Sequence, residues 1–225
     1  MVISDICRCD KSFFYRCINI EIVFMLKCYN NSSIIKLNDI TIKQEAIMEI
    51  KDPKVVHDYL NGVIEGEDVK KSTKLYSSAK TFYKDVDSSV ADDQIMYEVY
   101  SYEHDGLCYG LTVMQPVCVN GECNVTRGHF HEDLDCDEIY CGMGGEGLLL
   151  LMDEDYHCHA EKVYCGSVHY IDGHLAHRLV NTGNSELKVQ CMWPSHAGHD
   201  YKRVEENPFT VRVFKENGEL KVEGE

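Results

Sequence analysis

The stretch that decides the fold reads TRGHFHEDLDCDEIYCG and runs from Thr126 to Gly142. His129 and His131 lie one residue apart, and Glu138 follows a short acidic run. On a β-strand alternate side chains share one face, so the two imidazoles point the same way and Phe130 points the other way. An HxH pair alone is weak evidence for a metal site in a chain with 11 histidines. Glu138 strengthens the prediction, since an antiparallel strand returning after the acidic turn would bring a carboxylate to the same point.

A second block, from Gly166 to Asn181, supplies the candidate for a fourth ligand. It contains a glycine, a turn at Asp172 and Gly173, and then His177 with Asn181 four residues later. Four nitrogen and oxygen donors of this kind suit a divalent first-row metal, and the order of affinities does not choose among iron, manganese, nickel and zinc. The remaining histidines considered are left out of the site: His157 and His159 as a surface pair, His169 and His174 as possible supports for His177, and His104 and His196 as ordinary residues.

Composition limits the possible architectures and partners. The chain has 225 residues, 44% of them hydrophobic, with only four prolines, which predicts one main domain with a sizeable core. Its formal charge is -16, from 38 acidic and 22 basic residues. Such a charge disfavours nucleic acids and anionic membranes as partners. An anionic ligand must therefore be bound locally, by a few positioned cationic side chains, by a metal ion or by backbone amides.

The 12 cysteines do not follow the spacing of a zinc ribbon. No CxxC pair occurs anywhere in the chain, whereas such a ribbon needs closely spaced pairs in two places. We therefore expect a cytoplasmic protein in a reducing environment, with most thiols acting as small buried apolar groups.

Residues 1–47 differ in composition from the rest. They hold six basic and five acidic side chains, against 16 and 33 in residues 48–225. The apolar run Ile18 to Leu26 is shorter than the roughly 20 residues that a bilayer requires, and no cleavage pattern of a signal peptide follows it. Met25 and Met48 are possible alternative starts. We expect residues 1–47 to be an atypical, poorly ordered leader that the chemistry does not need.

The pattern after Met48 predicts one short helix and then many strands. The apolar spacing from Asp52 to Gly66 favours a helix, followed by a polar connection to about Val86. Short runs rich in β-branched and aromatic residues then alternate with Gly, Asp and Asn, which is typical of an all-β sandwich or jelly-roll barrel. The predicted strands are Gln94–Tyr102, Gly110–Met114, Glu138–Cys141, Gly147–Met152, His157–Val163, Ser167–Ile171, Ala176–Asn181, Leu187–Trp193 and Thr210–Lys215.

The two histidine blocks resemble the paired motifs of the cupin superfamily. This resemblance implies a double-stranded β-helix, that is, a jelly-roll barrel, which carries here a short helical N-terminal extension. It also implies that one divalent metal per chain is bound by His129, His131, Glu138 and His177; we favour Fe2+, with Mn2+, Ni2+ or Zn2+ as alternatives. The sequence departs from the usual second block, because Asp172 and His174 stand where a proline and a second glycine are common.

A narrower resemblance covers about residues 86–222 of the cupin domain, which we place at residues 48–225. TRGHFH at 126–131, DEIY at 137–140, AHRLVN at 176–181 and especially AGHDY at 197–201 are similar to blocks of the cupin-type, or archaeal-type, glucose-6-phosphate isomerases. This resemblance implies a homodimeric aldose-ketose isomerase. It also implies a sugar-phosphate pocket that includes Tyr97, Thr112, Thr126, Gly128, Tyr140, His199 and Tyr201.

The resemblance also suggests roles for single residues. Arg127 stands where that family commonly has a lysine, and its fork of donors suits phosphate oxygens. Glu138 is the candidate for hydrogen transfer between C1 and C2, either as a base that also ligates metal or as a ligand during a hydride shift. His199 and Tyr201 are candidates for ring opening or for proton exchange at O5.

Two other functions fit part of the pattern. A cupin dioxygenase, or another metal-dependent cupin enzyme such as a sugar-phosphate epimerase, would use similar ligands. A dioxygenase, however, would leave the series Thr126, Arg127, Gly128 and the AGHDY block without a purpose. A non-catalytic sugar-binding cupin would commonly have lost a ligand, and none is lost here. Isomerisation therefore remains the favoured prediction, although fold alone never fixes function.

Overall fold

The computed structural model describes residues 35–37, 40–42 and 49–224. The predictions made for the leader around Ile18–Leu26, Met25 and Met48 lie outside these residues. The chain divides into two compact units, Met1–Asp52 and Pro53–Glu225. In the first unit, β1 (Ile35–Leu37) pairs antiparallel with β2 (Ile40–Ile42).

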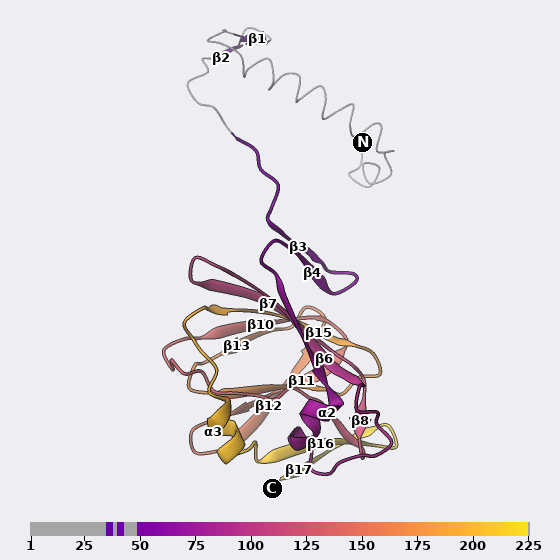
Figure 1. Cartoon of the computed structure of the whole chain (residues 1–225). Coiled ribbons are helices and arrows are strands. Elements are labelled where there is room, and N and C mark those ends of the chain that lie inside the picture. Colours follow the sequence, from indigo (N-terminus) through magenta and orange to yellow (C-terminus); the bar gives the residue numbers. More distant parts are fainter. Residues whose placement is uncertain (1–34, 38–39, 43–48, 225) are drawn as a thin grey trace. The chain divides into compact units, whose positions relative to one another are not determined.

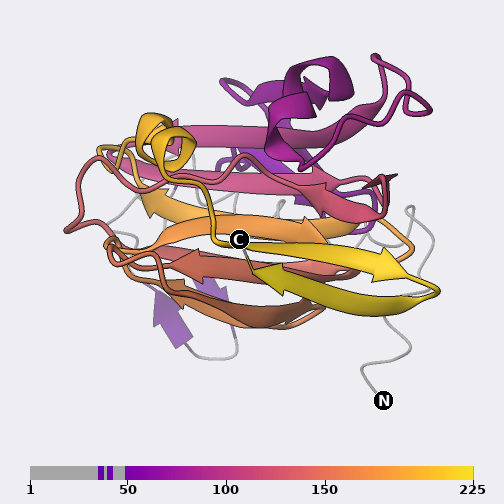
Figure 2. The ribbon, with the colours of Figure 1, turned by 90° about the horizontal axis from the view of Figure 1, so that it is seen from below.

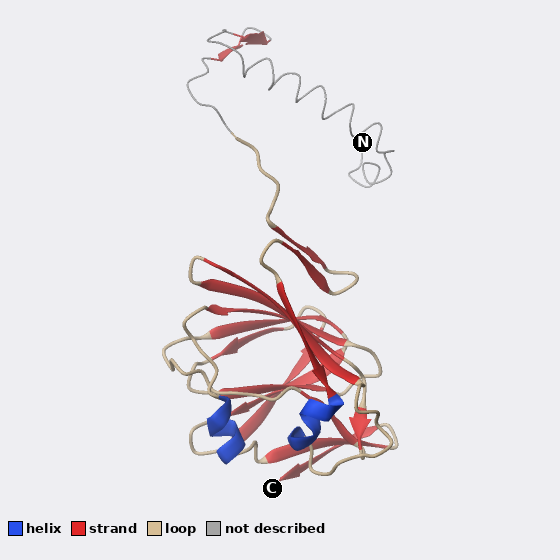
Figure 3. Ribbon diagram, viewed as in Figure 1, coloured by secondary structure: helices blue, strands red, loops and turns tan. Residues whose placement is uncertain are grey.

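The second unit is built from two antiparallel sheets that form the upper and lower layers of the barrel in Figure 1 and are coloured as strands in Figure 3. The six-stranded sheet has the order β13 (Val168–Ile171), β10 (Glu138–Gly144), β15 (Leu187–Pro194), β7 (Leu107–Met114), β6 (Ile95–His104) and β5 (Lys70–Leu75). The other sheet has the order β12 (Cys158–Tyr164), β11 (Glu146–Met152), β14 (Ala176–Asn181), β9 (Glu122–Val125), β16 (Val211–Glu216) and β17 (Glu219–Gly224), with β8 (Cys118–Val119) paired to β9.

The apolar core fills the space between these layers. Leu149, Leu151 and Met152 of β11 and Leu187 of β15 are fully or almost fully buried, as is Phe130 of the HxH segment. Seen from below in Figure 2, the hairpin of β16 and β17, in yellow, closes this side of the barrel. The fold is the all-β cupin jelly roll that the sequence predicted.

Each of the nine predicted strands appears within a few residues of its expected bounds, and β14 matches at both ends. The sequence reading missed β5, β8, β9 and β17. These strands are short or polar: β5 reads KKSTKL, and β17 is exposed along most of its length. Their pairing to long neighbours, rather than their own apolar pattern, holds them in the sheets.

The helix predicted over Asp52–Gly66 is wrong. The segment forms a hairpin of β3 (Val55–Asp58) and β4 (Val63–Gly66). Asp58 begins the turn by accepting hydrogen bonds from the backbone amides of Leu60 and Asn61, and Gly62 adopts φ +69°. Glycine takes this left-handed conformation without the steric cost that a side chain imposes.

The hairpin also covers the outer face of the six-stranded sheet. Ile64 of β4 is buried in a second apolar cluster with Tyr100 of β6 and with Leu111 and Val113 of β7. This burial explains the failed helix prediction, because tertiary packing selects the extended form for a segment whose own pattern is ambiguous.

Helical structure is limited in the described residues to three short pieces. They are α2 (Tyr76–Ala79), the 3-10 turn η2 (Lys80–Phe82) and α3 (Tyr201–Glu206). The side chain of Asp200 accepts a hydrogen bond from the amide of Arg203 and so caps α3. None of the helices in the described part of the chain is long and apolar enough to cross a membrane.

Candidate active site

Three histidines and one glutamate converge inside the barrel. One donor atom from each of His129, His131, Glu138 and His177 lies within 4.8 Å of the others. His129 faces His177 of β14 through two backbone hydrogen bonds, of 3.3 Å from the His129 amide and 3.0 Å from the His177 amide. Pairing of the HxH segment with β14 therefore positions both imidazoles on one sheet.

Glu138 comes from the opposite sheet. It is the first residue of β10, which pairs with β13 and β15 and not with the HxH segment. The prediction that this strand returns antiparallel beside the HxH pair is therefore wrong, although the carboxylate does reach the histidines. Its Oε2 lies 3.3 Å from Nε2 of His131 and 3.1 Å from Nε2 of His177.

Backbone carbonyls orient two of the imidazoles. Nδ1 of His131 donates to the carbonyl of Cys136 at 2.6 Å, and Nδ1 of His177 donates to the carbonyl of Leu175 at 3.3 Å. A carbonyl oxygen only accepts, so each Nδ1 carries the proton and each Nε2 presents a lone pair to the interior. Such a partner on the second ring nitrogen is the usual way in which a ligating histidine is held in place.

The donor set fits a metal ion. Nε2 of His129 and Nε2 of His177 are buried and have no hydrogen-bond partner within the described residues; the 3.1 Å approach of His177 to Glu138 lacks hydrogen-bond geometry. Buried polar atoms without partners are rare, because each retains the cost of its desolvation. A divalent cation among three imidazoles and a carboxylate would satisfy these atoms.

The electrostatics favour the ligating forms of His129 and Glu138, whereas burial lowers the pKa of His131 but its contacts with Glu138 and with the Cys136 carbonyl outweigh this and leave it raised. Burial, together with the nearby imidazoles of His177, His199 and His131, holds the pKa of His129 well below its usual value. Burial raises the pKa of Glu138, but the close imidazoles of His131 and His177 outweigh it and leave this pKa lowered. The glutamate is therefore ionised and His129 is neutral, as metal ligation requires.

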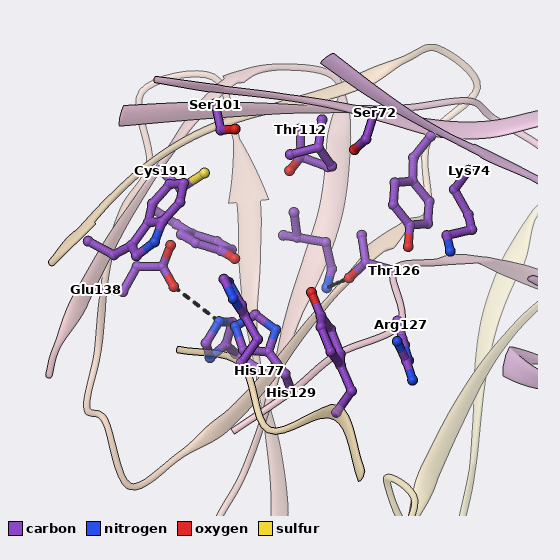
Figure 4. A pocket seen from close by; sticks show the side chains of 18 of the residues that line it. Ser72, Lys74, Ser101, Thr112, Thr126, Arg127, His129, Glu138, His177 and Cys191 are labelled. Atoms are coloured by element: carbon purple, nitrogen blue, oxygen red, sulfur yellow. Dashed lines mark hydrogen bonds and ion pairs between the residues drawn. The ribbon is translucent and has the colours of Figure 1, made fainter. Parts of the chain in front are cut away.

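The cluster forms one wall of a cavity of about 380 Å³, shown in Figure 4. All the residues predicted to bind or convert a sugar phosphate line this cavity: Tyr97, Thr112, Thr126, Arg127, Gly128, Glu138, Tyr140, His199 and Tyr201. His129 and His177 also line it. The structure thus brings together residues from four strands, two connecting segments and the first turn of α3.

Strand alternation explains why these side chains share the cavity. Tyr97 and Val99 lie two residues apart on β6, and Glu138 and Tyr140 lie two apart on β10, so each pair faces the interior. Thr112 of β7 is the register partner of Val99. Burial raises the pKa of Tyr97 to about 12 and that of Tyr140 well above its usual value, so both phenols are neutral donors.

The sequence reading missed the contribution of β5. Ser72, Thr73 and Lys74 line the cavity, although this segment was read as a polar connection. Lys74 is the register partner of Tyr97, which places its stem on the cavity side of the sheet. Nζ of Lys74 lies 5.8 Å from the ring centroid of Phe82 and forms no ion pair within the described residues, so its charge is available to a ligand. Trp193 and Ser101 were also missed as lining residues.

Arg127 is already engaged by its surroundings. Its Nη2 pairs with Glu205, and its guanidinium lies over the ring of Tyr201 at 4.2 Å from the centroid. Arg178 donates to the carbonyl of Arg127 at 2.7 Å and so fixes the backbone before Gly128. The charge of Arg127 is therefore shared with a carboxylate, which makes Lys74 the less encumbered cation of the cavity.

Gly128 is required by the backbone. Its φ is +75°, and a Cβ there would lie 2.7 Å from the ring of Phe209. The next residue, His129, starts the pairing with β14. The glycine therefore allows the chain to turn closely past Phe209 and place its first histidine.

His199 and Tyr201 close the side of the cavity near His129. Their ring centroids lie 4.4 Å and 5.4 Å from that of His129, and their own rings are nearly parallel. The residue between them is held by a backbone hydrogen bond of 2.8 Å from the amide of Asp200 to the carbonyl of Phe130. Burial lowers the pKa of His199, which favours its neutral form.

The two histidines considered as supports for His177 have other partners. His169 is bonded to Glu161 and Ser167, and His174 approaches Glu154. The carbonyl of Leu175 takes the supporting role instead. His157 and His159 are exposed, as expected for a surface pair.

The fold is a jelly-roll barrel, and three histidines and one glutamate converge inside it. This combination defines a cupin whose site is suited to a divalent metal. The family model for glucose-6-phosphate isomerase (GPI) matches residues 62–223. The chain belongs to the glucose-6-phosphate isomerase family, in its archaeal, cupin-type branch.

Relatives in this family match about three quarters of the chain. The glucose-6-phosphate isomerase of Thermococcus kodakarensis is 36% identical over 183 residues, which are 78% of this chain and 96% of the relative. That of Pyrococcus horikoshii is 35% identical over 173 residues, 73% of this chain and 90% of the relative. A solved oxalate oxidase in complex with the substrate analogue glycolate has a TM-score of 0.38 and 14% identity, over 61% of this chain and 56% of that chain, a likeness too low to support a conclusion.

Proposed function

We propose that this chain interconverts glucose 6-phosphate and fructose 6-phosphate. The observation that carries the proposal is the His129, His131, Glu138 and His177 cluster at the wall of a polar cavity, in a chain whose relatives are named for this reaction. The cavity holds hydroxyl, imidazole and cationic groups suited to a sugar phosphate, together with a carboxylate at the metal cluster.

The four clustered residues would hold one divalent first-row metal, with Fe2+ favoured over Mn2+, Ni2+ or Zn2+. When bound, such an ion polarises the carbonyl of an open-chain sugar. The carbonyl partners of His131 and His177 keep their Nε2 atoms aimed at this point. Oxygen and nitrogen donors alone leave the choice of metal to availability in the cell.

Glu138 is the residue we assign to hydrogen transfer. It is the one carboxylate among the described residues that line the cavity. Its contacts to His131 and His177 keep it ionised, so it can accept a proton from the carbon next to the carbonyl and return it to the neighbouring carbon. The alternative is a hydride shift between C1 and C2, in which Glu138 remains only a ligand.

We assign the phosphate to the end of the cavity formed by Lys74, Thr126 and Arg127. Thr126 already accepts a hydrogen bond from the amide of Leu179 through its hydroxyl oxygen, which leaves the hydroxyl hydrogen for a phosphate oxygen. Arg127 offers further N–H donors while pairing with Glu205. Lys74 and Arg127 thus supply local positive charge for a dianionic substrate, although the whole protein carries a formal charge of -16.

His199 and Tyr201 are placed for the opening of the sugar ring. They line the cavity and stack nearly parallel beside His129. The lowered pKa of His199 leaves a neutral imidazole that can pass a proton at O5. Tyr201, whose pKa is raised by burial, would orient the same oxygen as a donor.

We also propose that the chain acts as a homodimer in the cytoplasm. The outer face of β10 and β13 exposes Ile139, Val168 and Tyr170, an apolar surface of the kind that subunit contacts cover. Sedimentation that yields only a monomer would contradict the dimer. The cytoplasmic location rests on the cysteine spacing of the sequence.

One assay tests the proposed reaction. The purified protein is stripped with a chelator, reloaded with single divalent metals, and followed for conversion of glucose 6-phosphate to fructose 6-phosphate. Activity is expected only in the reloaded samples. A metal-loaded protein that binds the sugar phosphate but never converts it would instead support a binding module, and oxygen consumption would support a dioxygenase.

A further inference from the structure

A second group of metal-ligating side chains lies outside the cavity. Donor atoms of Asp133, Cys136 and His196 are within 4.8 Å of one another. The three side chains offer one oxygen, one sulfur and one nitrogen. None of them lines the cavity described above, and the proposed reaction does not use them.

A tight turn brings the first two donors together. The amide of Cys136 donates to the carbonyl of Asp133 at 3.1 Å, and the amide of Asp135 donates to Oδ1 of Asp133 at 3.1 Å. This second bond leaves Oδ2 of Asp133 free to face His196, whose Nε2 lies 3.8 Å away. The turn is pressed against Gly173, where a Cβ would lie 2.5 Å from the carbonyl oxygen of Cys136.

A backbone contact fixes the third donor beside the turn. The amide of Asp133 donates to the carbonyl of Ala197, the residue after His196, at 2.9 Å. Gly198 packs equally closely, since a Cβ there would meet the side chain of Glu132. Two segments that are about 60 residues apart in sequence are therefore held together by their backbones, which places the three donors without any ion.

We propose that Asp133, Cys136 and His196 bind a thiophilic divalent cation of the Zn2+ type, with water as the fourth ligand. Zinc takes thiolate, imidazole and carboxylate donors in a tetrahedron, and this cluster supplies one of each. Cys136 is only 4% exposed, whereas His196 is exposed, so the ion enters from solvent on the His196 side. Binding releases the thiol proton of Cys136 to solvent.

This position connects two parts of the active site. The carbonyl of Cys136 accepts the hydrogen bond from His131 that orients its imidazole. His196 belongs to the same loop as His199, three residues later. An ion at this cluster ties the turn behind a metal-cluster histidine to the loop that carries His199, so we infer that it stabilises the geometry of the cavity.

Cadmium provides the test, because a thiolate bound to Cd2+ gives a charge-transfer absorption that imidazole and carboxylate ligands do not. The full-length protein is titrated with Cd2+ as wild type, Cys136→Ser, Asp133→Asn and His196→Ala. We expect Cys136→Ser to lose one equivalent of the absorption, and the other two variants to weaken it by about 10-fold or more in affinity. His157→Ala is the matched control, since His157 is an exposed histidine beside Asp153, and it should bind as wild type does.

The variants also separate this cluster from the other thiols and from the cavity. Thiols elsewhere in the chain absorb equally in all variants, and the three histidines and Glu138 contribute no thiolate band. Unchanged Cd2+ binding in Cys136→Ser, or in both Asp133→Asn and His196→Ala, would overturn the proposal. Asp133→Asn and His196→Ala decide the matter alone if Cys136→Ser does not fold, as judged by circular dichroism.

Discussion

Glu138 and His177 meet across the barrel: Oε2 of the first lies 3.1 Å from Nε2 of the second, although β10 and β14 belong to different sheets. The ligand cluster therefore exists only when the two sheets have closed on each other. A metal bound there would stabilise the folded chain over the unfolded one, by a free energy that grows with the logarithm of the metal concentration relative to the dissociation constant.

Replacing His177 should remove metal and activity together. His177→Ala deletes one donor of four, and we expect the bound metal and the isomerase activity to fall in parallel while the barrel remains folded. Metal analysis and circular dichroism measure the two effects, with His157→Ala as a control at an exposed histidine. Full metal occupancy in His177→Ala would remove this residue from the ligand set.

Glu138→Gln separates the base from the ligand. The change keeps the shape and one ligating oxygen but lowers basicity, so kcat should fall by roughly 10² or more while metal stays bound. A metal-loaded Glu138→Gln protein with nearly unchanged kcat, and with no solvent hydrogen incorporated at C1 or C2 of the product, would instead favour the hydride shift.

Lys74 and Arg127 should act on binding of the phosphate. Lys74→Ala and Arg127→Ala each remove a charged donor, and we expect KM for glucose 6-phosphate to rise by about 10-fold or more with a smaller change in kcat. Lys74→Ala should have the larger effect, because Arg127 already shares its charge with Glu205. Neither change should affect an unphosphorylated hexose, and an equal loss with that substrate would argue against phosphate contact.

Gly128→Ala should destabilise the protein. The new Cβ would meet Phe209 at 2.7 Å in a backbone with φ +75°, a combination expected to cost about 1–3 kcal/mol in the free energy of unfolding. Urea unfolding measures this. Gly106→Ala is the matched control, because it shares a positive φ but meets no atom within 4 Å. Equal losses in the two variants would show that the backbone conformation, and not the contact with Phe209, is responsible.

Ile64→Ala should show that the β3–β4 hairpin contributes to the stability of the barrel. Ile64 is 2% exposed against the outer face of β6 and β7, so its truncation should cost about 2–5 kcal/mol. Leu60→Ala, in the turn of the same hairpin and 91% exposed, should change the free energy of unfolding little. A loss in Ile64→Ala no larger than in Leu60→Ala would mean that the hairpin is not firmly attached.

The sequence predicted those strands and site residues that can be recognised from the pattern of neighbouring residues alone. Runs rich in β-branched and aromatic residues revealed β6, β7 and β14, and the spacing of His129 and His131 anticipated their convergence. What it missed depends on distant contacts. Lys74 enters the cavity because β5 pairs with β6, and the 52–66 segment is extended because Ile64 finds an apolar surface on the sheet. Neither partner is visible from local sequence.

The placement of β5 at the end of its sheet gives its lysines a second task. Its outer edge is unpaired within the described residues, and an open edge invites pairing with another chain. Lys70 and Lys71 are exposed on this strand; Lys71 pairs with Glu98 of β6 at 2.8 Å, which leaves the charge of Lys70 to oppose such association. The strand that supplies Lys74 to the cavity therefore also protects the protein from aggregation. Replacing these lysines with apolar residues would allow strands of two chains to pair at this edge and would lower the solubility of the protein.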